Sequence, residues 1–109
     1  MATIKGQVSE ALQPGDTLES LVCYWQPLIG DYEWNDESWG PIQKTSGIEL
    51  PEREFDAGYG GVRGDRVICF SERYVYIRGQ YDGLEWVEAI PRSPESLLAF
   101  GGIPEPVGR

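Results

Sequence analysis

The dipeptide Asp82-Gly83 constrains the fold of this chain more than any other feature of its sequence. It lies between two runs of strand-forming residues, 73–81 and 84–90. A two-residue connection of this composition favours a type I′ turn, which needs positive φ at both central positions. Residues 73–90 are therefore predicted to form a β-hairpin, and Pro91 ends its second strand.

A further apolar run at residues 66–70 precedes this hairpin, with a tight turn expected at Ser71-Glu72. Together the three runs predict an antiparallel meander at about 66–90. The two-residue loop also sets the register, because residues at equal distances from it face each other. One face is predicted to carry these pairs, joined by Ile68 and Phe70: Tyr81 with Leu84, Gly79 with Trp86, Ile77 with Glu88, and Val75 with Ile90. The opposite face carries Tyr76 with Ala89, Arg78 with Val87, and Gln80 with Glu85, together with Val67, Cys69 and Tyr74.

The first half of the chain gives weaker signals. Residues 4–8 alternate in polarity, which predicts an edge strand, and a short strand is expected around Ile48. Apolar residues at 18, 21, 22 and 25 form a helical stripe, with Asp16 placed as N-cap and Glu19 at N3. The β propensity of residues 22–25 argues for a strand instead, and the helix is favoured. A short helix is also expected at residues 93–101.

Residues 14–21, Pro-Gly-Asp-Thr-Leu-Glu-Ser-Leu, resemble the opening of a LysM domain, in which this turn leads into the first helix. The resemblance implies binding of peptidoglycan or chitin through the helix and loops that follow. The Asn and Leu-x-x-Gly pattern that continues the family's motif does not occur in this sequence. We therefore use the resemblance only as support for a helix that begins near Thr17, and assign no family.

Taken together, these elements predict an α+β fold made of a single domain, residues 1–109. Its core is a curved antiparallel β-sheet, barrel-like or half-barrel, because both faces of the meander are partly apolar. One or two short helices pack on it. The 40% hydrophobic content of the chain is enough for one core. The tail at residues 102–109 contains two prolines and is expected to be extended or frayed.

The formal charge of −9 comes from 18 acidic and 9 basic residues. Such a field repels phosphate backbones, so we expect no nucleic-acid partner. No apolar stretch is long enough for a membrane span, and the first six residues lack the apolar region of a signal peptide. These features predict a cytoplasmic protein with no membrane partner. The acidity serves solubility or forms an acidic face that docks on a basic protein.

The chain contains no histidine, which removes the commonest general base and metal ligand. No cofactor, metal site or catalytic residue is predicted, and a binding protein is a better hypothesis than an enzyme. Cys23 and Cys69 are the two cysteines, and both lie among apolar neighbours. We expect buried thiols, with a disulfide between them as the alternative.

Two places are predicted as ligand-binding sites. The first is an aromatic and acidic segment, from which we select Asp31, Glu33, Trp34 and Trp39. Aromatic faces beside carboxylates suit a cation, a basic side chain or a sugar. The alternative is that its tryptophans are core residues and its acids solvate a loop.

The second place is on the meander, where the register groups Glu88 with Trp86, and Tyr76 lies nearby. If Glu88 points inward, its carboxylate is desolvated unless it pairs with a base such as Arg66. It would then serve either as a structural ion pair or as the acid that anchors a ligand.

The leading hypothesis is a non-catalytic binding protein with an aromatic and acidic cleft for a small cationic or amphipathic ligand. The second hypothesis is an acidic protein-interaction factor, such as an antitoxin, immunity protein or phage-type inhibitor, that docks on a basic partner. A small carboxylate-based enzyme is the third. An exposed strand edge or aromatic patch would also be compatible with a homodimer.

Overall fold

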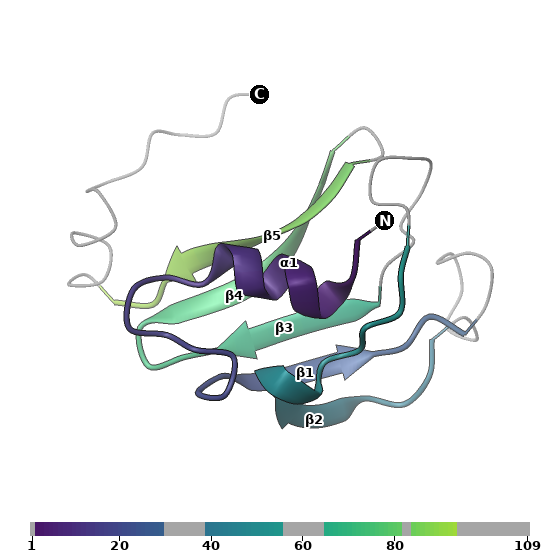
Figure 1. Cartoon of the computed structure of the whole chain (residues 1–109), viewed down its shortest axis with the longest axis horizontal. Coiled ribbons are helices and arrows are strands. Elements are labelled where there is room, and N and C mark those ends of the chain that lie inside the picture. The colour runs from purple at the N-terminus through teal and green to yellow at the C-terminus, as the bar shows by residue number, and fades with distance from the viewer. Residues whose placement is uncertain (1, 30–38, 56–64, 82–83, 94–109) are drawn as a thin grey trace.

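The computed structural model describes residues 2–29, 39–55, 65–81 and 84–93. These residues form one antiparallel sheet of five strands, in the order β2-β1-β3-β4-β5, with one α-helix packed against it (Figure 1). In chain order the elements are α1 (Ile4–Ala11), β1 (Val22–Gln26), β2 (Gln43–Ser46), the 3-10 helix η2 (Gly47–Glu49), β3 (Arg66–Phe70), β4 (Tyr74–Tyr81) and β5 (Leu84–Pro91).

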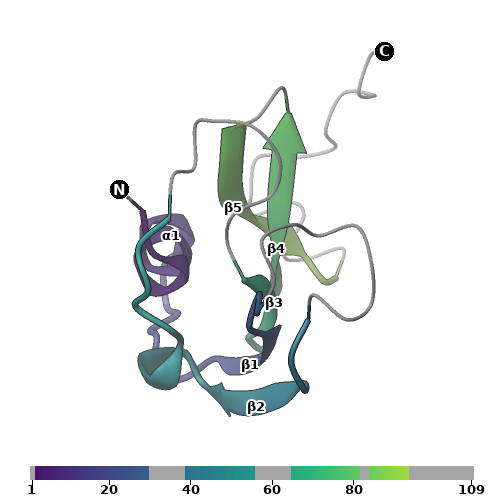
Figure 2. The ribbon, with the colours of Figure 1, turned by 90° about the vertical axis from the view of Figure 1, so that its right-hand side faces the viewer.

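Among the described residues, α1 and η2 cover one face of the sheet and no element covers the other (Figure 2). Figure 2 shows α1 and η2 on the same side of the sheet, and we call the face toward α1 the inner face and the opposite one the outer face. The described strands form an open sheet whose edges are β2 and β5. This structure confirms an antiparallel sheet with a helix, while closure into a barrel-like shape stays a prediction. No helix in the described ranges is both long and apolar enough to cross a bilayer.

The meander at residues 66–90 is confirmed, and so is the register of its second hairpin. Tyr81 pairs with Leu84, Gly79 with Trp86, and Ile77 with Glu88. The Trp86 ring lies against Gly79 and leaves no room there for a Cβ. This contact is a familiar way to shield a strand glycine.

The first turn of the meander lies one residue later than predicted. The Ser71 amide donates to the Tyr74 carbonyl at 2.9 Å, so the loop is Glu72-Arg73 and β4 begins at Tyr74. Cys69 consequently pairs with Tyr76. Moving the turn by one residue changes the pairing between β3 and β4 by two positions, so their side chains keep the faces predicted for them.

Residues 4–8 were predicted as an edge strand, and that prediction is wrong. They belong to α1, because Ile4 and Val8 are four residues apart and both point into the core, where they are 1% and 0% exposed. A spacing of four satisfies the helical period as well as the alternation of a strand. Thr3 decides between them, since its hydroxyl accepts a hydrogen bond from the Gly6 amide at 2.9 Å and caps the helix.

The helix predicted from Thr17 onward is also wrong. Thr17 and Ser20 form a tight turn through reciprocal backbone and side-chain hydrogen bonds, and residues 22–26 form β1. β1 lies between β2 and β3, so both of its edges are hydrogen-bonded. Pairing on two sides favours the β-branched and aromatic residues 22–25 over a helical stripe. Ile48, expected in a strand, lies in η2, directly after β2.

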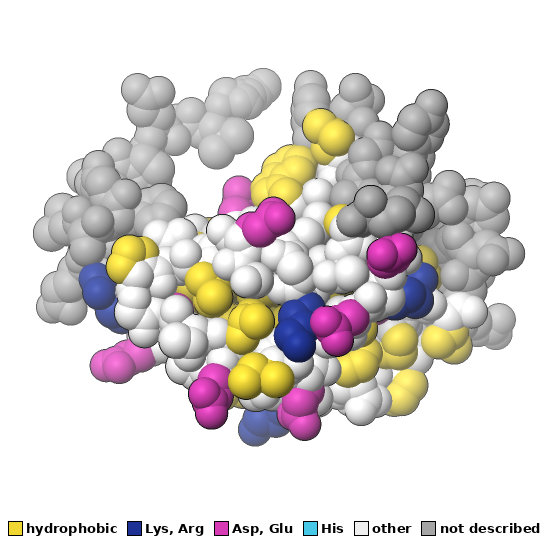
Figure 3. Space-filling model, viewed as in Figure 1, with side chains coloured by type: hydrophobic (Ala, Val, Ile, Leu, Met, Phe, Trp, Pro, Cys, Tyr) yellow, Lys and Arg dark blue, Asp and Glu magenta, His cyan; other side chains and the backbone are white. Residues whose placement is uncertain are grey.

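The core lies between α1 and the inner face. Its members are buried side chains from α1, from the sheet and from the loops that frame them: Ile4, Val8, Leu21, Cys23, Leu50, Phe55, Val67, Cys69, Tyr74, Tyr76, Val87 and Ala89. On the surface above α1, acidic, basic and hydrophobic side chains are interspersed (Figure 3). The short helix expected at 93–101 and the tail at 102–109 lie outside the described residues, apart from Ser93.

Candidate functional site

The predicted site residues that the structure describes do not form one cluster. Asp31, Glu33 and Trp34 lie outside the described residues. Tyr76 is fully buried on the inner face, whereas Trp86 and Glu88 are on the outer face of β5. The sheet therefore separates Tyr76 from the two residues with which it was grouped.

Glu88 is not the buried acid that the sequence suggested. The predicted register is correct, but the face that carries Glu88 is the open one, and its side chain is exposed. Its carboxylate accepts a hydrogen bond from the Trp86 indole at 3.3 Å. The predicted partner Arg66 instead hydrogen-bonds the Gln26 amide oxygen at 3.4 Å.

Tyr76 has a structural role in the described region. Its hydroxyl donates to the Asp16 carboxylate at 2.5 Å and accepts from the Gln13 amide at 3.1 Å. Burial, reinforced by the Asp16 hydrogen bond, raises the pKa of this phenol well above its ordinary value of 10.0. Tyr76 thus ties the loop after α1 to the centre of the sheet.

Two linked ion pairs, Arg78–Glu85 and Arg53–Asp65, each contain a buried carboxylate. The side chains of Arg78 and Glu85 are 13% and 0% exposed, and they form a salt bridge between β4 and β5. Arg78 also donates to the Asp65 carbonyl at 3.1 Å, and the Asp65 carboxylate is paired with Arg53 at 2.7 Å. Burial lowers the pKa of Arg78, and the charges of Glu85 and Asp65 oppose that shift. This network joins the sheet to the segments around residues 53 and 65.

Cys23 and Cys69 are both buried, and they face each other across β1 and β3 as free thiols. The Cys69 thiol donates a hydrogen bond to the Cys23 sulfur, and this bond, together with burial, raises the pKa of Cys69. A buried, protonated thiol is a poor nucleophile. The pair therefore packs as small apolar side chains in the core, as the sequence predicted.

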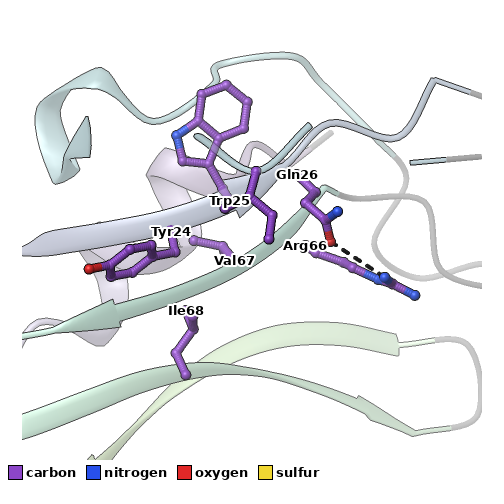
Figure 4. Close-up of a pocket in the computed structure, with 7 residues that line it drawn as sticks. Tyr24, Trp25, Gln26, Arg66, Val67 and Ile68 are labelled. Carbon is purple, nitrogen blue, oxygen red and sulfur yellow. Dashed lines mark hydrogen bonds between the residues drawn. The ribbon is translucent and has the colours of Figure 1, made fainter. Parts of the chain in front are cut away.

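A pocket of about 180 Å³ opens on the outer face over β1 and β3. It is lined by Tyr24, Trp25, Gln26, Ile42, Arg66, Val67 and Ile68. In Figure 4, Tyr24 of β1 and Ile68 of β3 lie on neighbouring strands, and Arg66 extends toward Gln26 at the far end. Ile42 and Ile68 are 67% and 37% exposed. The pocket is thus an apolar floor with one cation at its end.

Cations gather on this side of the sheet, each above an aromatic ring. Lys44 lies 5.7 Å from the centre of the Tyr24 ring, and Arg66 lies 4.1 Å from that of Trp39. Arg92 lies 5.6 Å from the centre of the Phe70 ring. The strands described here place one carboxylate, Glu88, on the outer face. The described side chains of this face therefore carry a local charge opposite in sign to that of the whole chain.

Trp39 contributes to this arrangement as a support for Arg66. It was predicted to bind a ligand directly, but it is 8% exposed and its segment is bridged to Leu28. Its ring packs under the Arg66 guanidinium, a cation–π contact that restrains the cation beside the pocket.

The pocket itself was missed by the sequence reasoning. Finding it requires β1 and β3 to be neighbours, and no short turn joins residues 26 and 66 to reveal that pairing. The available signal was the β propensity of residues 22–25, together with the placement of Ile68 beside Phe70 on one face.

The chemistry that the lining can supply is binding. Its described residues offer aromatic and aliphatic surface, the Gln26 amide and one guanidinium, and none of them is a carboxylate, lysine or cysteine. Within the described ranges, no group of three or more Asp, Glu, Cys or His side chains is arranged to hold a metal ion. Comparison of the chain with protein-family models, curated proteins and solved structures finds no match.

Proposed function

We propose that this chain is a non-catalytic binding protein that holds a small amphipathic molecule on the outer face of its sheet. The observation that carries the proposal is Arg66 at the end of an exposed apolar floor, with no carboxylate among the described residues that line it. The apolar part of the ligand packs on Tyr24, Ile42 and Ile68. An anionic group of the ligand binds the guanidinium.

The proposed ligand carries an anionic group, whereas the sequence predicted a small cationic or amphipathic ligand. A cationic ligand was expected from Asp31, Glu33 and Trp34, which lie outside the described residues. The pocket favours an anion instead, because a cationic head group would meet Arg66 and Lys44 with no carboxylate among the lining residues that the structure describes. Arginine also offers a planar fork of donors that matches a carboxylate or sulfonate.

A direct test uses two amphiphiles of opposite charge and equal chain length, decanoate and decyltrimethylammonium. Thermal unfolding is followed while each is added below its micellar concentration. A ligand that binds only the folded state raises the unfolding temperature by mass action. We expect a rise with decanoate and none with the cation. Equal shifts with both, or a shift with the cation alone, would contradict an anion-binding pocket.

A pair of arginine variants assigns the effect to the pocket. Arg66→Gln removes the cation at the pocket and should weaken decanoate binding about tenfold, or about 1.4 kcal/mol. Arg73→Gln is the matched control, because Arg73 is an exposed arginine in the loop before β4. It should leave the affinity unchanged. The same loss in both variants would mean that net charge, and not Arg66, attracts the ligand.

Docking on a basic protein is the second candidate function. Five carboxylates in the described ranges are exposed around α1, η2 and the segment between η2 and Phe55: Glu10, Glu19, Glu49, Glu52 and Glu54. The surface above α1 interrupts its acidic side chains with basic and hydrophobic ones (Figure 3). A continuous acidic surface would favour this candidate more strongly, so we place it second.

A further inference from the structure

Cys23 and Cys69 lie at the centre of the sheet, one on each of the neighbouring strands β1 and β3. Their Cα atoms are directly opposite each other in the antiparallel register. Both residues are free cysteines, both are 0% exposed, and both belong to the core beneath α1. Two paired strands therefore hold the two sulfur atoms together, and no loop has to move to bring them into contact.

The hydrogen bonds of β3 show which kind of cross-strand pair the two cysteines form. The Ser71 amide donates to the Tyr74 carbonyl at 2.9 Å, which makes these two residues a hydrogen-bonded pair of the hairpin. Two residues along, Cys69 and Tyr76 form the next such pair. The backbone polar groups of Cys69 therefore point toward β4, and its pair with Cys23 on β1 is a non-hydrogen-bonded one. In such a pair the Cα atoms are about 4.5 Å apart, inside the range of about 4.4–6.8 Å that a disulfide spans.

The contact between the two sulfur atoms gives them different chemical roles. The Cys69 thiol donates a hydrogen bond to the Cys23 sulfur, which lowers the pKa of Cys23 although burial opposes the shift. Because the thiolate is the nucleophile, Cys23 is the sulfur that attacks an oxidant. Cys69 keeps its proton and lies within reach of the product. An attacking cysteine beside a second thiol is the arrangement found where oxidation is reversible.

We propose that Cys23 and Cys69 are an oxidation site, at which a peroxide forms a disulfide that joins β1 to β3. The Cys23 sulfur attacks the O–O bond of hydrogen peroxide and becomes a sulfenic acid, and one water is released. The Cys69 sulfur then attacks the sulfenic sulfur, its S–O bond breaks, and a second water leaves. Both thiol protons end in these waters, so two thiols are oxidised and one peroxide is reduced. This site does not depend on the proposed function, because it requires no ligand in the pocket.

Burial determines which oxidant suits the site. Hydrogen peroxide is small and uncharged, whereas glutathione disulfide is large and charged and cannot contact a residue that is 0% exposed in the intact sheet. The same burial places the sulfenic acid against Cys69 and away from solvent. Condensation with the second thiol therefore precedes further oxidation to a sulfinic acid.

The disulfide fastens the two strands that also form the pocket. Tyr24 and Ile68 follow and precede the cysteines in the chain, pair with each other, and line the pocket on the opposite face. A cross-link stabilises mainly by restricting the unfolded chain, and its effect grows with the length of chain that it closes, here residues 23–69. The oxidised protein should therefore unfold at a temperature higher by at least about 10 °C.

Mass spectrometry of the full chain tests the site directly. The folded protein is incubated with millimolar hydrogen peroxide, then unfolded in urea and alkylated with iodoacetamide. We expect an intact mass lower by two hydrogens, no alkyl group, and a linked pair of peptides that contains both cysteines. Two alkylated thiols after prolonged incubation, or a sulfinic acid on either sulfur, would overturn the proposal.

Two serine variants distinguish the roles of the sulfur atoms. In Cys69→Ser a hydroxyl replaces the donor, but no thiol is present to condense with the sulfenic acid. Dimedone, which reacts with sulfenic acids, should then label Cys23. In Cys23→Ser the remaining thiol is the protonated one, and labelling should be at least about tenfold slower. Equal labelling of the two variants, with circular dichroism showing both folded, would overturn the assignment of Cys23 as the attacking sulfur.

Thermal unfolding measures what the disulfide does to the sheet. The reduced and the peroxide-treated wild type are compared, and dithiothreitol should abolish the rise of at least about 10 °C in the treated protein. Peroxide-treated Cys69→Ser is the matched control and should show no rise, because it forms no cross-link. An unchanged or lowered unfolding temperature in the oxidised wild type would show that the bond does not fit the paired strands.

Discussion

The inner and outer faces of the sheet are made by alternate residues of the same strands, yet they differ in what covers them. The inner face packs against α1 and contains the buried aromatic residues Tyr74 and Tyr76. The outer face leaves Ile68, Trp86 and Ile90 exposed to between 36% and 42%. Polarity does not explain the difference, because the inner face also buries the Arg78–Glu85 ion pair. A face is buried when its polar groups find partners and a second layer is available to cover it.

The largest expected difference in stability between the faces comes from replacing two glutamates of β5. Glu85 points to the inner face and Glu88 to the outer one. Glu85→Gln leaves the charge of Arg78 without its carboxylate in the core, and should lower the free energy of unfolding by about 3–5 kcal/mol. Glu88→Gln alters an exposed group and should change it by about 0.5 kcal/mol or less.

Urea unfolding of both variants, followed by tryptophan fluorescence, measures the difference. If Glu85→Gln is too unstable to fold, Arg78→Met/Glu85→Leu removes both charges and should recover most of the loss. Equal stability of Glu85→Gln and Glu88→Gln would show that the ion pair is not buried in solution.

What the sequence could predict depended on how locally each feature is determined. The register of β4 and β5 was predictable because Asp82-Gly83 determines it within two residues. The pairing of Cys23 with Cys69 was not, because 45 residues separate them and no turn chemistry links their strands. The helix at residues 4–11 was missed because its buried residues are four apart, a spacing shared by strand and helix.

The candidate site shows the same limit. The sequence placed Glu88, Trp86 and Ile77 on one face correctly, but alternation cannot say which face a helix will cover. Glu88 was therefore given an inward position that belongs to Glu85. Arg66 was considered only as a partner for that acid. Its place beside Tyr24 and Ile68 requires the β1–β3 pairing, which is a tertiary property.

A smaller difference in the loss of stability is expected when one isoleucine of each face is replaced by alanine. Ile4, in the first turn of α1, is 1% exposed, and Ile68, on the outer face of β3, is 37% exposed. Ile4→Ala should lower the free energy of unfolding by about 2–4 kcal/mol, because it leaves a cavity between the helix and the sheet. Ile68→Ala should cost about 1 kcal/mol or less. Both are measured by urea unfolding without ligand, and an equal loss would mean that the outer face is covered as well.

The smallest expected effect is a pH dependence of the stability, caused by the buried Tyr76 of the inner face. Tyr76→Phe removes a hydroxyl with two hydrogen-bond partners, Asp16 and the Gln13 amide, and should cost about 1–2 kcal/mol near neutral pH. In the folded protein the pKa of this phenol is raised above 10.0, by burial first and by Asp16 second. The unfolded chain therefore loses the proton at lower pH than the folded one. With fewer protons bound in the unfolded state, stability must fall as the pH rises above about 10.

This loss should be absent in Tyr76→Phe, so the stability difference between the wild type and the variant narrows between pH 9 and pH 11. Tyr24→Phe, which alters a half-exposed phenol of the outer face, keeps Tyr76 and should retain the wild-type slope. Urea unfolding at three pH values across this window measures all three proteins. A constant difference between the wild type and Tyr76→Phe would show that the buried phenol ionises as easily in the folded state as in the unfolded chain. The inner face would then be open to water at Tyr76, and the contrast between the two faces would be one of composition alone.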